Sequence, residues 1–131
     1  QDYTVVYHNR EHKLYVEGCG LLRLAEGVML AIVPIVPRSE WTEKMRPRHS
    51  HLHVMRSEDH GRTWREVSEL PYYSGRLWSY EGKLYLFAFT PGPKHRNDDL
   101  LLLRSDDGGS TWSKPVTLFP GHYWNCCTNL V

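Results

Sequence analysis

The chain has 131 residues, enough for one domain, and 40% of them are hydrophobic, so a packed core can form. Acidic and basic residues nearly cancel at a formal net charge of +1, which argues against a nucleic-acid-binding protein that relies on a strong basic field. No apolar run reaches the roughly 18 residues of a membrane-spanning helix, so the sequence predicts no membrane span.

The N-terminus and the cysteines bear on the compartment of the protein. The sequence begins at Gln1 rather than methionine, which indicates a processed or trimmed N-terminus, and we expect a secreted or periplasmic protein. Three cysteines with an adjacent pair form neither a disulfide framework nor a zinc ribbon. We expect Cys19, Cys126 and Cys127 to be small buried side chains of inner strands.

The first half of the chain predicts an early strand over residues 3–8 and then a unit of four short strands. Residues 20–33 form two strands around a tight turn at Glu26-Gly27, without a helical period. A long loop follows over residues 34–50. The third strand is expected over residues 51–56 and the fourth over residues 64–70.

The second half repeats this pattern. Residues 75–89 form two strands that turn at Glu81-Gly82. A longer loop is expected over residues 90–98, a third strand over residues 99–104 and a fourth over residues 112–119. The sequence pattern of each half therefore predicts four antiparallel strands and no helix.

An eight-residue motif joins the third and fourth strands in both halves. Residues 57–64 and 105–112 both follow the pattern S-x-D-x-G-x-T-W, and their serines lie 48 residues apart. In such a turn the aspartate accepts backbone N–H groups, the glycine adopts positive φ and the tryptophan buries its ring at the next strand. A motif that recurs every 40 to 50 or so residues, with four strands per repeat, is typical of a β-propeller blade.

This repeat resembles the Asp box, or bacterial neuraminidase repeat, of the sialidase superfamily, over about residues 20–121. The resemblance implies an all-β fold, a six- or seven-bladed β-propeller in the complete protein. The chain 1–131 would then be the N-terminal part of a single propeller domain and would cover about two and a quarter blades. We expect blade 1 at about 17–70, blade 2 at about 71–119 and the start of blade 3 at 122–131. Residues 3–8 would supply the outer strand of the last blade, and the remainder of the propeller chain would be needed to close the ring.

The resemblance also implies which face binds ligand, namely the face opposite the Asp boxes, where the loops between second and third strands and the links between blades lie. The positive charge of these segments indicates an anionic ligand, such as a uronate or sialate carboxylate. We expect the substrate-binding residues to be Arg38, Arg46, Arg48, Arg76, His95, Arg96 and Tyr123.

Four residues on this face are candidates for proton transfer: His49, His51, Tyr73 and His122. Histidine titrates near neutral pH, and the superfamily places its acid/base group beside the third strand of the first blade, so His49 is preferred and His51 competes with it. His49, His51 and His53 alternate, so all three are expected on one side of a strand, with His53 packed among neighbours. We assign no metal ligand and no certain cofactor, although a structural or catalytic calcium or zinc ion is a minor alternative.

Two departures separate the sequence from true sialidases. Their first blade carries an Arg-Ile-Pro motif, whereas the matching residues 16–20 contain no arginine. The loop over residues 34–50 contains no aspartate, and Glu40 and Glu43 are its acids. The sequence is more similar to sialidase-like propellers that degrade acidic plant or algal polysaccharides with histidine, tyrosine and arginine.

We therefore expect a carbohydrate-active enzyme that cleaves glycosidic bonds in an acidic, uronate-containing oligo- or polysaccharide, as a glycoside hydrolase or a polysaccharide lyase. In a lyase, arginines would neutralise the uronate carboxylate while a histidine or tyrosine removes the C5 proton. In a hydrolase, an acid would protonate the leaving oxygen. A non-catalytic propeller that binds glycan or protein is the second hypothesis, and an exo-sialidase is the third.

Overall fold

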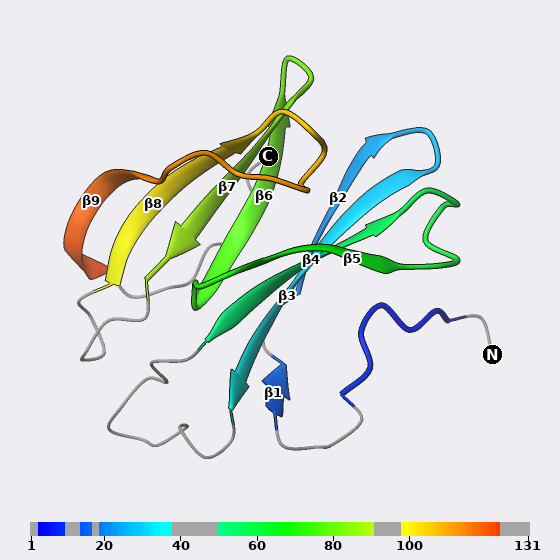
Figure 1. The fold of residues 1–131 in the computed structure, drawn as a ribbon, viewed down its shortest axis with the longest axis horizontal. Coiled ribbons are helices and arrows are strands. Elements are labelled where there is room, and N and C mark those ends of the chain that lie inside the picture. Colours follow the sequence, from blue (N-terminus) through cyan, green and yellow to red (C-terminus); the bar gives the residue numbers. More distant parts are fainter. Residues whose placement is uncertain (1–2, 10–13, 17–18, 38–49, 91–97, 124–131) are drawn as a thin grey trace.

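A computed structural model describes the chain except for residues 1–2, 10–13, 17–18, 38–49, 91–97 and 124–131 (Figure 1). The described residues form nine strands in two antiparallel sheets and contain no helix, which confirms the predicted all-β fold. In this part of the chain, accordingly, no helix is long and apolar enough to cross a membrane.

The first sheet has four strand positions, the first of which is divided between two short strands. Its strands are β1 (Leu14–Val16), β2 (Gly20–Ala25), β3 (Val28–Pro37), β4 (His51–Ser57) and β5 (Arg65–Leu70). Both β1 and β2 pair with β3, and β4 and β5 follow in order. The sequence did not predict β1, which pairs with residues 35–37 of β3 while β2 pairs with residues 28–32.

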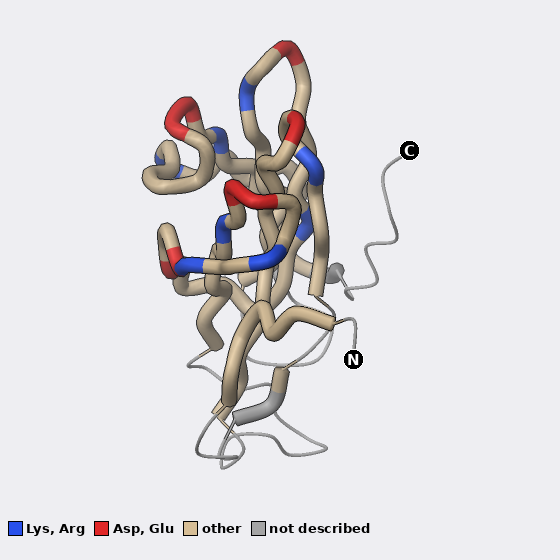
Figure 2. The backbone as a smooth tube through the Cα atoms, turned by 90° about the vertical axis from the view of Figure 1, so that its right-hand side faces the viewer, with Lys and Arg blue, Asp and Glu red and all other residues tan. Residues whose placement is uncertain are grey.

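The second sheet has the order β6-β7-β8-β9. Its strands are β6 (Ser74–Tyr80), β7 (Lys83–Phe89), β8 (Asp98–Ser105) and β9 (Val116–Tyr123). Each half of the chain thus folds as the predicted four-stranded antiparallel unit. The charged residues of the described chain lie mainly at the end of the sheets that carries the tight turns and the Asp boxes (Figure 2).

One strand is longer than the sequence predicts. We expected a loop from Pro34, but β3 continues to Pro37 and pairs with β4 up to Ile35 and His51. Pro34 falls between the residues of β3 that pair with β2 and those that pair with β1. The ladder is already interrupted on that edge, so the missing N–H of proline is tolerated there.

Both ends of the described chain differ from expectation. Described residues 3–9 form no strand, and Val6 and Tyr7 instead pack on the first sheet. Strand β9 runs to Tyr123, which pairs with Asp98, so His122 and Tyr123 belong to the second sheet and do not begin a new one. Register shifts on both sides of Leu100 accommodate the added length.

The main core lies between the two sheets, because alternate residues of each strand point to opposite faces. The first sheet contributes Leu30, Ile32, Leu52 and Val54, and the second contributes Leu84, Leu86, Ala88, Leu101 and Leu103. A smaller cluster covers the other face of the first sheet, where Val6, Tyr7 and Trp64 pack on Ala31, Val33, Ile35 and Met55. Since both faces of the first sheet are covered, β3 is an almost continuous apolar run.

The outer face of the second sheet is open and aromatic. The ring centroid of Trp78 lies 5.4 Å from that of Tyr85, 5.6 Å from that of Tyr80 and 6.4 Å from that of Phe87. Trp78 is 37% exposed and Tyr80 is 53% exposed. An open pocket of about 360 Å³ adjoins these rings and is lined by Tyr85, Leu102, Leu103, Arg104, Ser113, Lys114 and Val116.

The first Asp box is a closed hydrogen-bonded turn, as predicted. The carboxylate of Asp59 accepts the N–H of Thr63 at 2.9 Å and its hydroxyl at 2.6 Å. The buried hydroxyl oxygen of Ser57 accepts the N–H of Gly61 at 2.8 Å. Gly61 has a φ of 83° and its carbonyl accepts the indole N–H of Trp64.

The second box repeats these bonds. Asp107 accepts the N–H of Thr111 at 2.9 Å and its hydroxyl at 2.6 Å, and Ser105 accepts the N–H of Gly109 at 2.9 Å. Gly109 has a φ of 95°, and its carbonyl accepts the indole N–H of Trp112. The motif therefore builds the same local turn in both sheets, as predicted.

Candidate functional site

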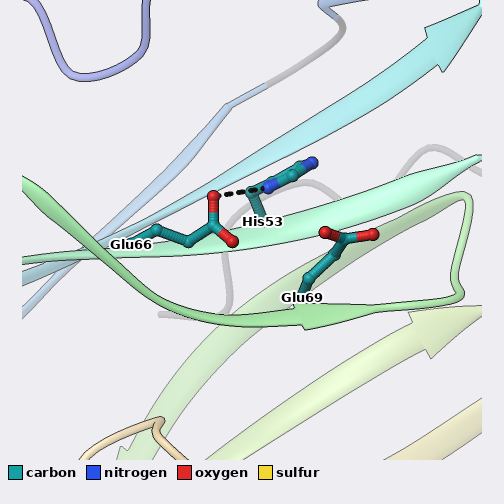
Figure 3. Close-up of side chains that lie close together, drawn as sticks. All are labelled: His53, Glu66 and Glu69. Atoms are coloured by element: carbon teal, nitrogen blue, oxygen red, sulfur yellow. Dashed lines mark hydrogen bonds and ion pairs between the residues drawn. The ribbon is translucent and has the colours of Figure 1, made fainter.

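Two histidines and two glutamates converge on one face of β4 and β5. Figure 3 shows three of them, His53, Glu66 and Glu69. His51 and His53 alternate along β4 and share this face, as predicted. Nδ1 of His53 lies 2.8 Å from Oε2 of Glu66, and Nδ1 of His51 pairs with Oε1 of Glu69. We call these four residues the histidine–glutamate cluster.

A β-bulge is what brings the two glutamates together. Glu66 and Glu69 are three residues apart, so a regular strand would place them on opposite faces. The register shifts here, because Val54 pairs with Ser68 whereas Met55 pairs with Glu66. Val67 lies between them without a partner in the register, so both glutamates face the same side of the sheet.

The cluster is half-open to solvent. The side chain of His53 is only 14% exposed, whereas those of His51, Glu66 and Glu69 are 46%, 44% and 44% exposed. The ring of Tyr7 packs 5.6 Å from that of His53 and closes one side. Burial raises the pKa of the Tyr7 hydroxyl, and the negative charges of Glu66 and Glu69 raise it further, so Tyr7 faces the cluster as a neutral phenol.

The cluster offers two kinds of chemistry. A carboxylate that holds Nδ1 of a histidine fixes the tautomer and the ring orientation, which leaves Nε2 to exchange a proton. In His51 this arrangement lies at the first residue of β4, directly after the loop that the sequence predicts to bind substrate. Separately, ligand atoms of His53, Glu66 and Glu69 all lie within 4.8 Å of one another.

Most of the predicted site residues lie where their side chains are not described. Arg38, Arg46, Arg48, His49, His95 and Arg96 lie outside the described residues. The side chains of His122 and Tyr123 are likewise not described, although both residues belong to β9. Their assignments stay predictions. The described residues bring His51 together with Glu69, a partner that the sequence did not suggest.

Tyr73 is withdrawn from solvent. It is only 4% exposed, and its backbone N–H donates to the carbonyl of Phe89 at 2.9 Å. A buried hydroxyl would need an opening of the site to reach substrate. The catalytic assignment of Tyr73 stays a prediction.

Arg76 reaches from β6 toward the first sheet. A Cβ built on Gly20 would lie 3.4 Å from Nη1 of Arg76. Partial desolvation raises the pKa of the neighbouring Cys19 thiol, and the positive charge of Arg76 partly opposes that rise. Cys19 is exposed rather than buried, because it precedes β2 instead of lying inside a strand. Arg76 thus places positive charge beside Cys19 and Gly20, at the end of the stretch that lacks the arginine of true sialidases.

No pattern in the sequence predicts that Glu66, Glu69 and Tyr7 belong to the site. The spacing of Glu66 and Glu69 points to opposite faces, and only the bulge in β5 reverses this. Tyr7 was expected in a strand of another blade, but it packs beside His53. Neither a bulge nor a long-range ring contact leaves a pattern in one sequence.

Comparisons with protein-family models, with curated proteins and with solved structures find no match to this chain. Function is therefore inferred from the described residues themselves. The resemblance to Asp-box proteins depends on the two turn motifs alone.

Proposed function

We propose that the two sheets are successive blades of a β-propeller. The second Asp box supports this because its two glycines contact residues of the first sheet. Nη1 of Arg56 donates to the carbonyl of Gly108 at 3.3 Å, and the hydroxyl of Ser68 donates to the carbonyl of Gly109 at 2.6 Å. The indole N–H of Trp112 donates in turn to Ser68 at 3.0 Å. Face-to-face sheets locked by such a turn fit blades stacked around an axis.

The open face of the second sheet supports a further blade. Leu102, Arg104 and Val116 line its pocket, and each lies 48 residues after a residue of the first sheet: Val54, Arg56 and Ser68. These three residues of the first sheet contact the second box, with Val54 3.4 Å from a Cβ built on Gly109. The pocket is therefore equivalent to a surface that an Asp box already occupies.

This open face predicts that residues 1–131 expressed alone will associate or aggregate, because exposed apolar patches of this kind drive association. Sedimentation velocity of the purified chain would measure its mass distribution. A monodisperse monomer that unfolds cooperatively would contradict the blade count.

For activity, we propose that the protein cleaves glycosidic bonds in an acidic, uronate-containing glycan. The His51–Glu69 pair carries this proposal, since it supplies an oriented imidazole beside the third strand of the first unit. As a base, His51 would remove a C5 proton from a uronate, and as an acid it would protonate the leaving oxygen. Arg76, beside Gly20, would help to bind the carboxylate of the substrate.

A panel of acidic polysaccharides and sialylated glycans incubated with the full-length protein tests the activity. Reducing ends report cleavage of either kind, whereas absorbance of an unsaturated uronate reports a lyase alone. Substituting His51→Ala should reduce turnover by about a hundredfold or more, the low end for general acid–base catalysis. His49→Ala tests the competing assignment in the same assay.

A matched control is His60→Asn, a change of an exposed histidine in the first Asp box, whose φ of 60° asparagine tolerates. This variant should keep wild-type turnover. Full turnover in both His51→Ala and His49→Ala would overturn the assignment of the reacting centre. Release of sialic acid would favour the exo-sialidase, and binding without any cleavage would favour the non-catalytic propeller.

A further inference from the structure

Within the histidine–glutamate cluster, the mostly buried imidazole of His53 lies beside the carboxylates of Glu66 and Glu69. A ring nitrogen of His53 and one carboxylate oxygen each of Glu66 and Glu69 lie within 4.8 Å of one another. The two carboxylates carry like charges and share this small space with Tyr7, whose neutral ring lies beside His53. A cation between them would relieve their mutual repulsion.

We propose that His53, Glu66 and Glu69 bind one divalent transition-metal ion of the zinc class. One imidazole nitrogen with two carboxylates suits such ions, whereas calcium takes oxygen ligands alone. This set differs from the run of alternating histidines in β4, because two of its three ligands come from β5. The inference shares Glu69 and His51 with the proposed activity but does not rest on it, since its test measures binding of the metal alone.

The separations fit such an ion after small side-chain adjustments. Ligand atoms at a tetrahedral zinc, with bonds of about 2.0 to 2.1 Å, lie about 3.3 Å apart. The observed pair His53 Nδ1 and Glu66 Oε2 is closer, at 2.8 Å, and other pairs extend up to 4.8 Å. Both glutamates are partly exposed, so their carboxylates have room to turn, and solvent can reach the remaining coordination position.

His51 fits this site as a positioning residue. Its Nδ1 pairs with Oε1 of Glu69, one of the three proposed ligands. Carboxylate ligands are commonly held by hydrogen bonds of this kind, and loss of such a partner weakens metal binding about 10- to 100-fold. Burial of His53 between Tyr7 and the sheet fixes the third ligand.

Isothermal titration of the full-length, chelator-treated protein with Zn²⁺, and separately with Ca²⁺, tests the site. The wild type should bind one equivalent of Zn²⁺ and should bind Ca²⁺ far more weakly. Glu66→Gln and Glu69→Gln should each weaken Zn²⁺ binding at least about tenfold, because a neutral amide is a poorer ligand. X-ray absorption at the zinc edge should show imidazole scattering that His53→Asn removes.

The matched control is Glu58→Gln, a change of an exposed glutamate in the turn between β4 and β5 that pairs with Arg56 and Arg65 outside the cluster. Its affinity for Zn²⁺ should equal that of the wild type. Circular dichroism checks that each variant is folded. Less than one bound equivalent in the wild type, or equal affinities in Glu66→Gln, Glu69→Gln and Glu58→Gln, would overturn the proposal and leave two histidine–glutamate ion pairs instead.

Discussion

The two sheets contain the same turn but differ in what the turn contacts. In the second sheet, Gly109 is buried, and a Cβ on it would lie 3.4 to 3.6 Å from Val54, Leu84 and Leu30. In the first sheet, a Cβ on Gly61 would meet Met29 and the ring of Trp64, both of its own sheet. The motif thus determines the local turn. Whether the turn also packs against a second sheet depends on which sheet lies beside it.

The faces of the two sheets differ in the same way. The first sheet is covered on both sides, by the main core and by the cluster around Val33 and Met55. The second sheet buries Leu86 and Leu103 in the main core but leaves Trp78 partly exposed on its outer face. Equivalent strands are therefore buried to different extents. The same substitution should change the stability of the protein by a different amount in each repeat.

The largest difference in free energy of unfolding is expected between alanine substitutions of Gly75, near the start of β6, and of Gly20, at the start of β2. In Gly75→Ala the new Cβ would lie 2.7 Å from the carbonyl oxygen of Phe87 and 2.8 Å from Leu86, so backbone must move. Overpacking of this kind destabilises by about 3 kcal/mol. In Gly20→Ala the nearest atoms are side-chain atoms of Ile32 and Arg76, at 3.0 Å and beyond.

Because those side chains can shift, and because alanine lowers the entropy of the unfolded chain, Gly20→Ala should cost about 1 kcal/mol or less. Urea unfolding of both variants measures the comparison. Equal losses would show that the two repeats are packed alike at this position.

A smaller difference in free energy of unfolding is expected between substitutions of Trp64 and Trp112, the tryptophans of the two Asp boxes. The indole N–H of Trp112 donates to both the carbonyl of Gly109 and the hydroxyl of Ser68. The indole N–H of Trp64 donates to the carbonyl of Gly61. Trp112→Phe should therefore cost about 1 kcal/mol more free energy of unfolding than Trp64→Phe, the net value of one hydrogen bond. In a Ser68→Ala background the two costs should become similar, and a difference that persists would assign it to packing.

The smallest expected effect concerns the pH dependence of stability, and it should be the same for the aspartates of both Asp boxes. Hydrogen bonds from the hydroxyl and N–H of Thr63 hold the pKa of Asp59 at about 2, and Thr111 does the same for Asp107, against an ordinary value of 3.8. A depressed pKa in the folded state gives stability above about pH 4 that is lost as the pH falls toward 2, because the unfolded chain takes up protons first.

Asp59→Asn and Asp107→Asn should each flatten the pH dependence of the unfolding midpoint between about pH 4 and pH 2 by a similar amount. Thermal melts across this range measure the slopes. An effect in one box alone would mean that the carboxylate bonds are not purely local.

Local patterns in the sequence were enough for most of the strands and for the turns. The spacing of Ser57, Asp59, Gly61 and Trp64 specifies a turn whose hydrogen bonds join residues no more than four apart, so it folds alike in both repeats. Apolar strands separated by Glu26-Gly27 and Glu81-Gly82 likewise specify antiparallel pairs. The alternation of His51 and His53 placed both on one face for the same reason.

The register and the contacts between distant segments were decided by the tertiary structure alone. Glu66 and Glu69 share a face because pairing with β4 imposes a bulge, and a strand without its partner has no such constraint. Tyr7 reaches His53, and Gly109 reaches Ser68, across 46 and 41 residues of chain, respectively. Such contacts depend on how whole sheets pack, since burial of apolar faces rather than local backbone preference brings them together.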